Sequence, residues 1–204
     1  MRVLPILFNT EMVQAILDGR KSCTRRKISI DIVNNCDMET DGTLLAYENC
    51  YGDFIEPEKL CQYQSGDVIY VRETWCALPV NEAGHMRGHS VYYYKADGDL
   101  RPEGWRGNWH PSIHMPKEAA RIWLKVTDVR VERLNEITDK GAEREGAQPD
   151  YPFDYAVDKW PNLEHFKKIW NSTIKKPDLD RYGWDANPFV WVIEFERCEK
   201  PEVN

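Results

Sequence analysis

The feature that most constrains the fold is a series of short extended segments separated by polar turns and rarely by helices. The clearest segment is residues 68–73, which follow a turn at Ser65-Gly66-Asp67. Residues 121–134 alternate apolar and polar side chains, which is the period of a strand with one buried face. Because no strand–helix–strand rhythm connects these segments, the sequence predicts an α+β, mostly β fold rather than a parallel sheet.

The segments also predict the architecture. Further strands are predicted at residues 3–8, 27–32, 91–95 and 189–196, and helices at 11–18, 138–146 and 162–173. Several strands with few helices favour a small β-barrel with short peripheral helices. Residues 33–62 are polar and are interpreted as an insertion that carries a hairpin, and residues 97–117 as a long loop. The chain of 204 residues is expected to form a single domain.

Composition and charge limit the partners that such a chain can have. The formal net charge is −7, whereas a protein that coats nucleic acid non-specifically is usually basic. Any contact with nucleic acid is therefore expected to be local. The 8 Trp and 10 Tyr residues suit a β-rich fold, a surface on which bases stack, or both.

Hydropathy gives an expectation about the compartment. No apolar run approaches the length of a membrane span, and residues 1–5 do not resemble a signal peptide. The protein is therefore expected to be cytoplasmic, to have no membrane partner and to keep its cysteines reduced.

Residues that bind metals are present but lack the usual spacings. There is no Cys-x-x-Cys pair and no His-Glu-x-x-His motif. Two kinds of grouping are candidates for a metal site. One is the set of three cysteines in one segment, Cys36, Cys50 and Cys61. The other is the two histidine pairs at i, i+4, which are His85 with His89 and His110 with His114. We interpret these as ordinary side chains, so no metal and no cofactor is predicted.

A basic cluster follows the first predicted helix. Residues 19–26 read Gly-Arg-Lys-Ser-Cys-Thr-Arg-Arg, so four basic residues lie within seven positions. The cluster is an anion clamp, an activated-amine site or a solvated basic surface. Like charges and burial favour the neutral form of an amine, which can attack a carbonyl. Lys21 and Thr24 face one pocket if the chain turns between them and point apart if it is extended.

Glu73 lies at the end of the clearest strand. Strand alternation places it on the same face as Ile69 and Val71. A carboxylate on an apolar face is partly desolvated and needs a cation or a donor. Lys21 and the arginines around it are the expected partners, and the alternatives are an exposed Glu73 or a structural ion pair with Arg72 or Arg26.

Two motifs together resemble a known family. They are Gly19-x-Lys21-x-x-Thr24-Arg25-Arg26 and Gly66-Asp67-x-x-x-Val71-Arg72-Glu73-Thr74-Trp75, and they resemble those of the ASCH (activating signal cointegrator homology) family. That family is similar to PUA-like RNA-binding β-barrels. Residues 110–117, 121–124 and 184–192 resemble a longer branch often carried by bacteriophages and prophages. The resemblance spans most of the chain except residues 33–62.

The resemblance implies a reaction and three catalytic residues. A small bacterial member of the family is an amidohydrolase of acetylcytidine. Carried over to this sequence, its catalytic residues are Lys21, Thr24 and Glu73. The implied mechanism has Lys21 attack the acetyl carbonyl while Glu73 relays protons. Thr24 then positions Lys21 or holds the developing oxyanion.

The expected function is binding of a nucleoside, nucleotide or single-stranded RNA, with amidohydrolase activity at these three residues. The alternatives are a non-catalytic RNA-binding module, a ribonuclease, or a phage accessory protein whose protein partner the sequence does not identify. Residues expected to bind the ligand are Arg25, Arg26, Arg72, Trp75 and His114. Trp105, Trp109 and Trp184 are further candidates for base stacking, although each is also a candidate for packing.

Overall fold

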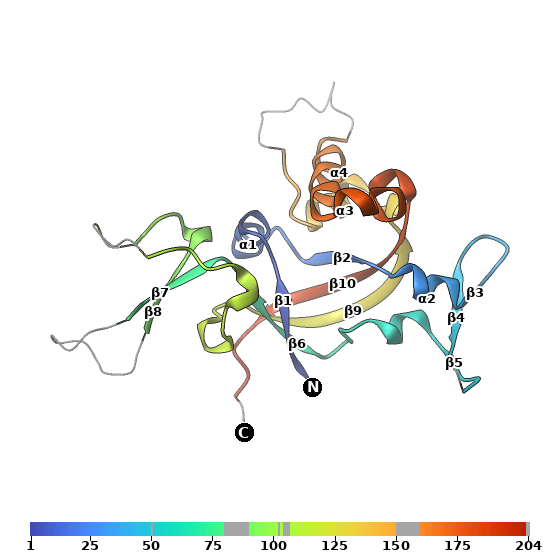
Figure 1. The fold of residues 1–204 in the computed structure, drawn as a ribbon, viewed down its shortest axis with the longest axis horizontal. Coiled ribbons are helices and arrows are strands. Elements are labelled where there is room, and N and C mark those ends of the chain that lie inside the picture. Colours follow the sequence, from blue (N-terminus) through green and yellow to red (C-terminus); the bar gives the residue numbers. More distant parts are fainter. Residues whose placement is uncertain (50, 80–89, 102, 104–106, 150–159, 203–204) are drawn as a thin grey trace.

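The centre of the molecule is a five-stranded sheet (Figure 1). The computed structural model describes residues 1–49, 51–79, 90–101, 103, 107–149 and 160–202. The strand order is β1 (Val3–Leu7), β6 (Val68–Arg72), β9 (Trp123–Arg133), β10 (Phe189–Cys198) and β2 (Cys23–Lys27). β1 and β6 run parallel, and the other neighbouring strands are antiparallel. The α+β expectation is confirmed at this level.

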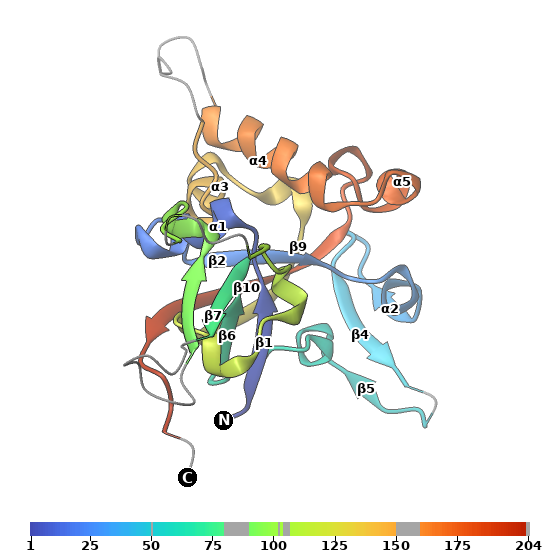
Figure 2. The same ribbon diagram turned by 60° about the vertical axis from the view of Figure 1, so that its left-hand side comes forward.

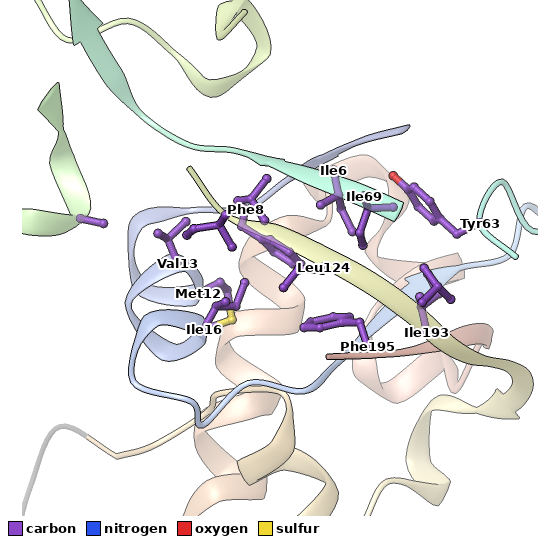
Figure 3. Close-up of a cluster of buried hydrophobic side chains, with 14 of the residues drawn as sticks. Ile6, Phe8, Met12, Val13, Ile16, Tyr63, Ile69, Leu124, Ile193 and Phe195 are labelled. Atoms are coloured by element: carbon purple, nitrogen blue, oxygen red, sulfur yellow. The ribbon is translucent and has the colours of Figure 1, made fainter. Parts of the chain in front are cut away.

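Helix α1 (Thr10–Leu17) closes the main core against the sheet. Asn9 caps the helix, because its side-chain oxygen accepts a hydrogen bond from the Met12 N–H. The apolar face of the helix meets inward-facing residues of several strands (Figure 3). The core side chains labelled there are Ile6, Phe8, Met12, Val13, Ile16, Tyr63, Ile69, Leu124, Ile193 and Phe195. This packing brings the end of α1 and the basic cluster that follows it against the sheet.

A second core lies on the other face of β10. Val190 and Val192 point away from Ile193, as strand alternation requires. Helices α3 (Asp139–Arg144) and α4 (Pro161–Thr173) cover them, with Phe166 and Trp170 on the buried face of α4. Both helices lie over the same side of the sheet (Figure 2). Strand β10 is thus buried on both faces, and α3 is held close to β2.

The sheet is not closed into the expected barrel, because β1 and β2 are its two edges. Pro5 in β1 has no N–H to donate to a neighbouring strand. The Leu7 carbonyl accepts a hydrogen bond of 2.9 Å from the Arg26 side chain rather than from a strand backbone. Tyr63 covers the opening, since its hydroxyl donates to the Pro5 carbonyl at 2.8 Å. The gap between the two edges therefore becomes a seam lined by side chains.

The expected insertion forms a small sheet of its own. Its strands are β3 (Cys36–Met38), β4 (Leu44–Glu48) and β5 (Phe54–Ile55), followed by the 3₁₀ turn η1 (Pro57–Leu60). This sheet projects on the side of the main sheet opposite to β7 (Trp75–Pro79) and β8 (Ser90–Tyr94), which pair with each other (Figure 1). The remaining elements are η2 (Lys95–Asp97), η3 (Ser112–His114), η4 (Lys117–Ala119), η5 (Leu134–Glu136), η6 (Lys176–Asp178), α5 (Leu179–Tyr182) and η7 (Trp184–Ala186).

The strand predicted at residues 27–32 is displaced. The strand is β2, which contains much of the basic cluster, and residues 30–34 form helix α2 (Ile30–Asn34). Ser29 caps this helix by accepting a hydrogen bond from the Ile32 N–H. The charged sequence of β2 did not predict a strand, because the carboxylates that neutralise Arg25 in the strand, Glu132 and Glu145, are far away in the sequence. Within the described ranges, no helix is long and apolar enough to cross a membrane.

Candidate functional site

The basic cluster turns once before it becomes a strand. Gly19 ends helix α1 with φ +75°, a conformation that favours glycine. The N–H groups of Arg20 and Lys21 both donate to the Ala15 carbonyl at 2.9 Å. Strand β2 starts at Cys23. Lys21 thus lies just before the strand and Thr24 within it, and both line the same cavity of about 150 Å³, called here the Lys21 cavity.

The Lys21 ammonium is surrounded by oxygen atoms. Its Nζ donates to the Cys23 carbonyl at 2.8 Å, to the Glu145 carbonyl at 2.7 Å and to Glu145 Oε2 at 2.8 Å. The Lys21 side chain is 1% exposed and that of Glu145 is 6% exposed. Glu145, which follows α3, is therefore the carboxylate that pairs with Lys21.

Gly146 allows this pairing. It has φ +87°, and a Cβ atom at this position would lie 2.6 Å from Ala15 Cβ and 3.2 Å from Lys21 Cβ. A residue with a side chain would push the end of α3 away from α1. The glycine thus brings the Glu145 backbone and carboxylate onto Lys21.

Arg25 extends the ion pair into a buried network. Its guanidinium contacts Glu145 Oε1 at 3.2 Å and Glu132 Oε2 at 2.8 Å. Burial raises the pKa of Glu132, but hydrogen bonds from Arg130 and Arg25 outweigh it and hold that pKa below the ordinary value. Two cations and two carboxylates therefore compensate one another beside the cavity. Arg25 lines the cavity, but its two terminal nitrogens bind these carboxylates.

The remaining walls of the Lys21 cavity are aromatic and polar. Phe8, Phe166 and Trp170 line it together with Asn9 and Thr24. Among the described residues, the Thr24 hydroxyl has no hydrogen-bond partner, although Thr24 is 5% exposed. Asn9 uses its side-chain oxygen as the cap of α1, which leaves its amide N–H groups for other acceptors.

Cys23 is not a nucleophile at this site. Burial, followed by the negative charge of Glu145, raises the pKa of its thiol to about 12. At neutral pH the sulfur therefore stays protonated, whereas nucleophilic cysteines are thiolates.

Glu73 is not the partner of Lys21. It is 1% exposed, and its carboxylate accepts hydrogen bonds from Arg121 Nε and Nη2, each at 3.0 Å. Arg121 also contacts Asp97. Burial raises the pKa of Glu73 above its ordinary value, although Arg121 opposes this shift. The desolvated carboxylate expected from strand alternation is thus present, but its cation comes from the residues before β9 and Glu73 does not line the Lys21 cavity.

The other expected ligand residues are divided between two places. Arg26 lines the Lys21 cavity and also a neighbouring cavity of about 430 Å³, called here the seam cavity, which Arg72 lines as well. Trp75 packs against Tyr92 and pairs with His110 through backbone hydrogen bonds. His114 is exposed in η3. Trp75 and His114 line neither of these cavities.

The candidate metal residues form no site within the described part of the chain. No group of three or more His, Cys, Asp or Glu side chains is arranged there to hold a metal ion. Cys50, His85, His89 and Trp105 lie outside the described residues. Trp184 packs edge-on against Phe166, and Arg101 lies over Trp109.

Comparisons with known proteins leave the family open. No protein-family model matches the chain, and no curated protein is significantly similar to it. A solved structure with some likeness is a crystal structure of an Enterococcus faecalis protein described by the family model DUF984. The two are 10% identical, the TM-score is 0.42, and the alignment covers 97% of this chain and 76% of that one.

Sequence reasoning missed the ion-pair partners of Lys21 and Glu73, which are Glu145 and Arg121. Glu145 precedes a glycine at the end of a short predicted helix, which is a local signal for a helix terminus and not for an ion pair. Arg121 precedes a long strand without any feature that links it to Glu73. Both pairs depend on how helices and strands pack, so no spacing in the sequence identifies them.

Proposed function

We propose that the protein binds a nucleoside, or an unpaired base of single-stranded RNA, in the Lys21 cavity. The observation that carries this proposal is a ring-sized cavity with aromatic walls and donors that protein atoms leave unused. A cavity of roughly 150 Å³ holds a benzene-sized ring, and a pyrimidine base is of similar size. A base pair is too large for it, which favours a single or unpaired base.

The polar groups of the cavity suit the edge of a base. The Thr24 hydroxyl, the Asn9 amide and the Arg26 guanidinium line it and carry N–H or O–H donors. Base edges present carbonyl oxygens and ring nitrogens as acceptors, and single-stranded recognition uses these edges. Phe8, Phe166 and Trp170 supply the aromatic part of the lining against which a base can pack.

Sequence and charge support the same class of ligand. The motifs at residues 19–26 and 66–75 resemble those of the ASCH family, for which a PUA-like fold and nucleoside or RNA ligands are expected. The charge of −7 argues against extended coating of nucleic acid, whereas a single buried base requires no basic surface.

A single substitution tests base binding. Thr24→Val keeps the shape of the side chain but removes the hydroxyl, so cytidine is expected to bind roughly 5- to 50-fold more weakly, as measured by isothermal titration calorimetry. Thr127→Val, on the exposed face of β9, is the matched control and should leave the affinity unchanged. If the unaltered protein binds no cytidine, uridine or unpaired oligonucleotide, the proposal is wrong.

Hydrolysis of an acylated base such as acetylcytidine is a second candidate. An amine, a hydroxyl and a carboxylate meet at the Lys21 cavity, from Lys21, Thr24 and Glu145. Three acceptors already bind the Lys21 ammonium, so we assign the attack on the acetyl carbonyl to the Thr24 hydroxyl. Its proton passes through the Lys21–Glu145 pair to the amino nitrogen of the base as the C–N bond breaks. Water then hydrolyses the Thr24 ester and releases acetate.

Release of acetate from acetylcytidine distinguishes the two candidates. If the reaction occurs, Thr24→Val should reduce its rate at least about 100-fold, because a nucleophile is lost, and Thr24→Ser should retain part of it. Liquid chromatography of substrate and cytidine measures the turnover. Binding of acetylcytidine without turnover, even at high enzyme concentration, would leave base binding and rule out hydrolysis.

A further inference from the structure

Two arginines from different strands of the main sheet line the seam cavity, which adjoins the Lys21 cavity. Arg26 is on β2, and its Nη2 donates to the Leu7 carbonyl at 2.9 Å. Arg72 ends β6, and it is the register partner of Leu7 in the parallel β1–β6 ladder. Both arginines line the seam cavity together with Leu7, the last residue of β1, where the sheet is open.

Within the described ranges no carboxylate forms an ion pair with Arg26 or Arg72, although the negative charge of Glu145 still acts on Arg26. Arg72 donates to the Ile113 carbonyl at 3.3 Å, and its Nε is buried without a hydrogen-bond partner. By contrast, Arg25 and Arg121 are each paired with carboxylates. In a chain with a net charge of −7, two unpaired guanidinium groups at one opening favour an anion from outside the protein.

The seam cavity joins this pair of arginines to the proposed base site. It has a volume of about 430 Å³ and is lined by Arg26 and Arg72 together with Tyr63, Gln62 and Trp191. Leu7 and Arg26 line both cavities, so the two adjoin at these residues. Arg26 and Leu7, which are hydrogen-bonded to each other, form the boundary between the two cavities, so a ligand that occupies both must pass Arg26.

We infer that the seam cavity receives a phosphate group joined to the nucleoside whose base occupies the Lys21 cavity, so that the ligand is a nucleotide. This inference rests on the proposed function. Guanidinium groups bind phosphate oxygens through paired, charge-assisted hydrogen bonds. Tyr63 and Trp191 leave an apolar wall for the sugar or for a following nucleotide.

The experiment compares ligands that differ by one phosphate. Calorimetry at low salt should give cytidine 5′-monophosphate an affinity at least roughly tenfold higher than that of cytidine. Arg72→Gln should remove most of this difference. Arg197→Gln, on the exposed part of β10, is the matched control and should retain it. In the unaltered protein the difference should shrink as salt is added, a test that does not depend on the folding of any variant.

The outcomes separate this inference from the proposed function. Equal affinities for cytidine and its monophosphate would overturn the phosphate site and leave base binding intact. Failure to bind either ligand or a short oligocytidine would overturn both. A higher affinity for the monophosphate than for cytidine shows that a free nucleotide is sufficient to occupy the phosphate site. A higher affinity for oligocytidine alone assigns the phosphate to an RNA strand.

Discussion

Replacing Glu145 with Gln is expected to lower the free energy of unfolding by about 3–5 kcal/mol, because it leaves buried positive charge without its counter-charge. Glu145 contacts both Lys21 and Arg25. The Lys21 side chain is 1% exposed, so water cannot replace the lost carboxylate. Urea denaturation at pH 7, followed by circular dichroism, measures the change.

A neighbouring glutamate provides the control for this prediction. Glu143 lies in α3, two residues before Glu145, and is exposed. Glu143→Gln should therefore change the free energy of unfolding by less than about 0.5 kcal/mol. The double variant Lys21→Met with Glu145→Gln should be more stable than the sum of the single effects predicts, because it removes both members of the pair. Equal stability of Glu145→Gln and Glu143→Gln would contradict the buried ion pair.

Replacing Arg121 with Met is expected to cost about 3 kcal/mol at pH 7, because Glu73 then keeps a buried charge without a cation. Glu73 is 1% exposed, and each of its two carboxylate oxygens accepts a hydrogen bond from Arg121. Burial already raises the pKa of Glu73 in the folded protein, and Arg121 limits that rise. Removing the arginine should raise the pKa further.

The pH dependence of this variant follows from that direction. A carboxyl whose folded pKa is raised contributes stability below its unfolded pKa and loses that contribution as pH rises through the folded pKa. Arg121→Met should therefore be close to the unaltered protein near pH 4 and fall progressively behind it toward pH 7. Urea denaturation across this range measures the trend. A difference in the free energy of unfolding that stays constant from about pH 4 to pH 7 would show that Glu73 does not titrate. The control Arg197→Met, at an exposed position, should have the same stability as the unaltered protein across this range.

These two predictions concern the ion-pair partners of Lys21 and Glu73, two residues that the sequence placed in one site. Strand alternation predicted that Glu73 continues the apolar face of Ile69 and Val71 and is desolvated, and the structure shows that its side chain is buried. It could not identify the cation, because Arg121 reaches Glu73 through the pairing of β6 with β9. Similarly, the spacing of Lys21 and Thr24 left two arrangements open, and only the tertiary structure shows that both residues line one cavity.

The barrel prediction differs from the structure for a comparable reason. Alternation and turn signals gave most strands of the main sheet, including the long β9 and β10. Whether a sheet closes depends on its two edge strands, and here Pro5 and the Arg26 side chain occupy that position. Hydrophobic periodicity carries no information about such an edge.

The sequence alone determined the α+β class, the long strands and the basic cluster at Lys21, because turn residues and apolar periodicity act locally. The tertiary structure decided which charges meet. It paired Lys21 with Glu145 and Glu73 with Arg121. It also placed Arg26 and Arg72, which form no ion pair with described residues, in the lining of the seam cavity with Leu7. Ion pairs between distant residues depend on three-dimensional proximity and burial, and neither is encoded in the spacing of residues along the chain.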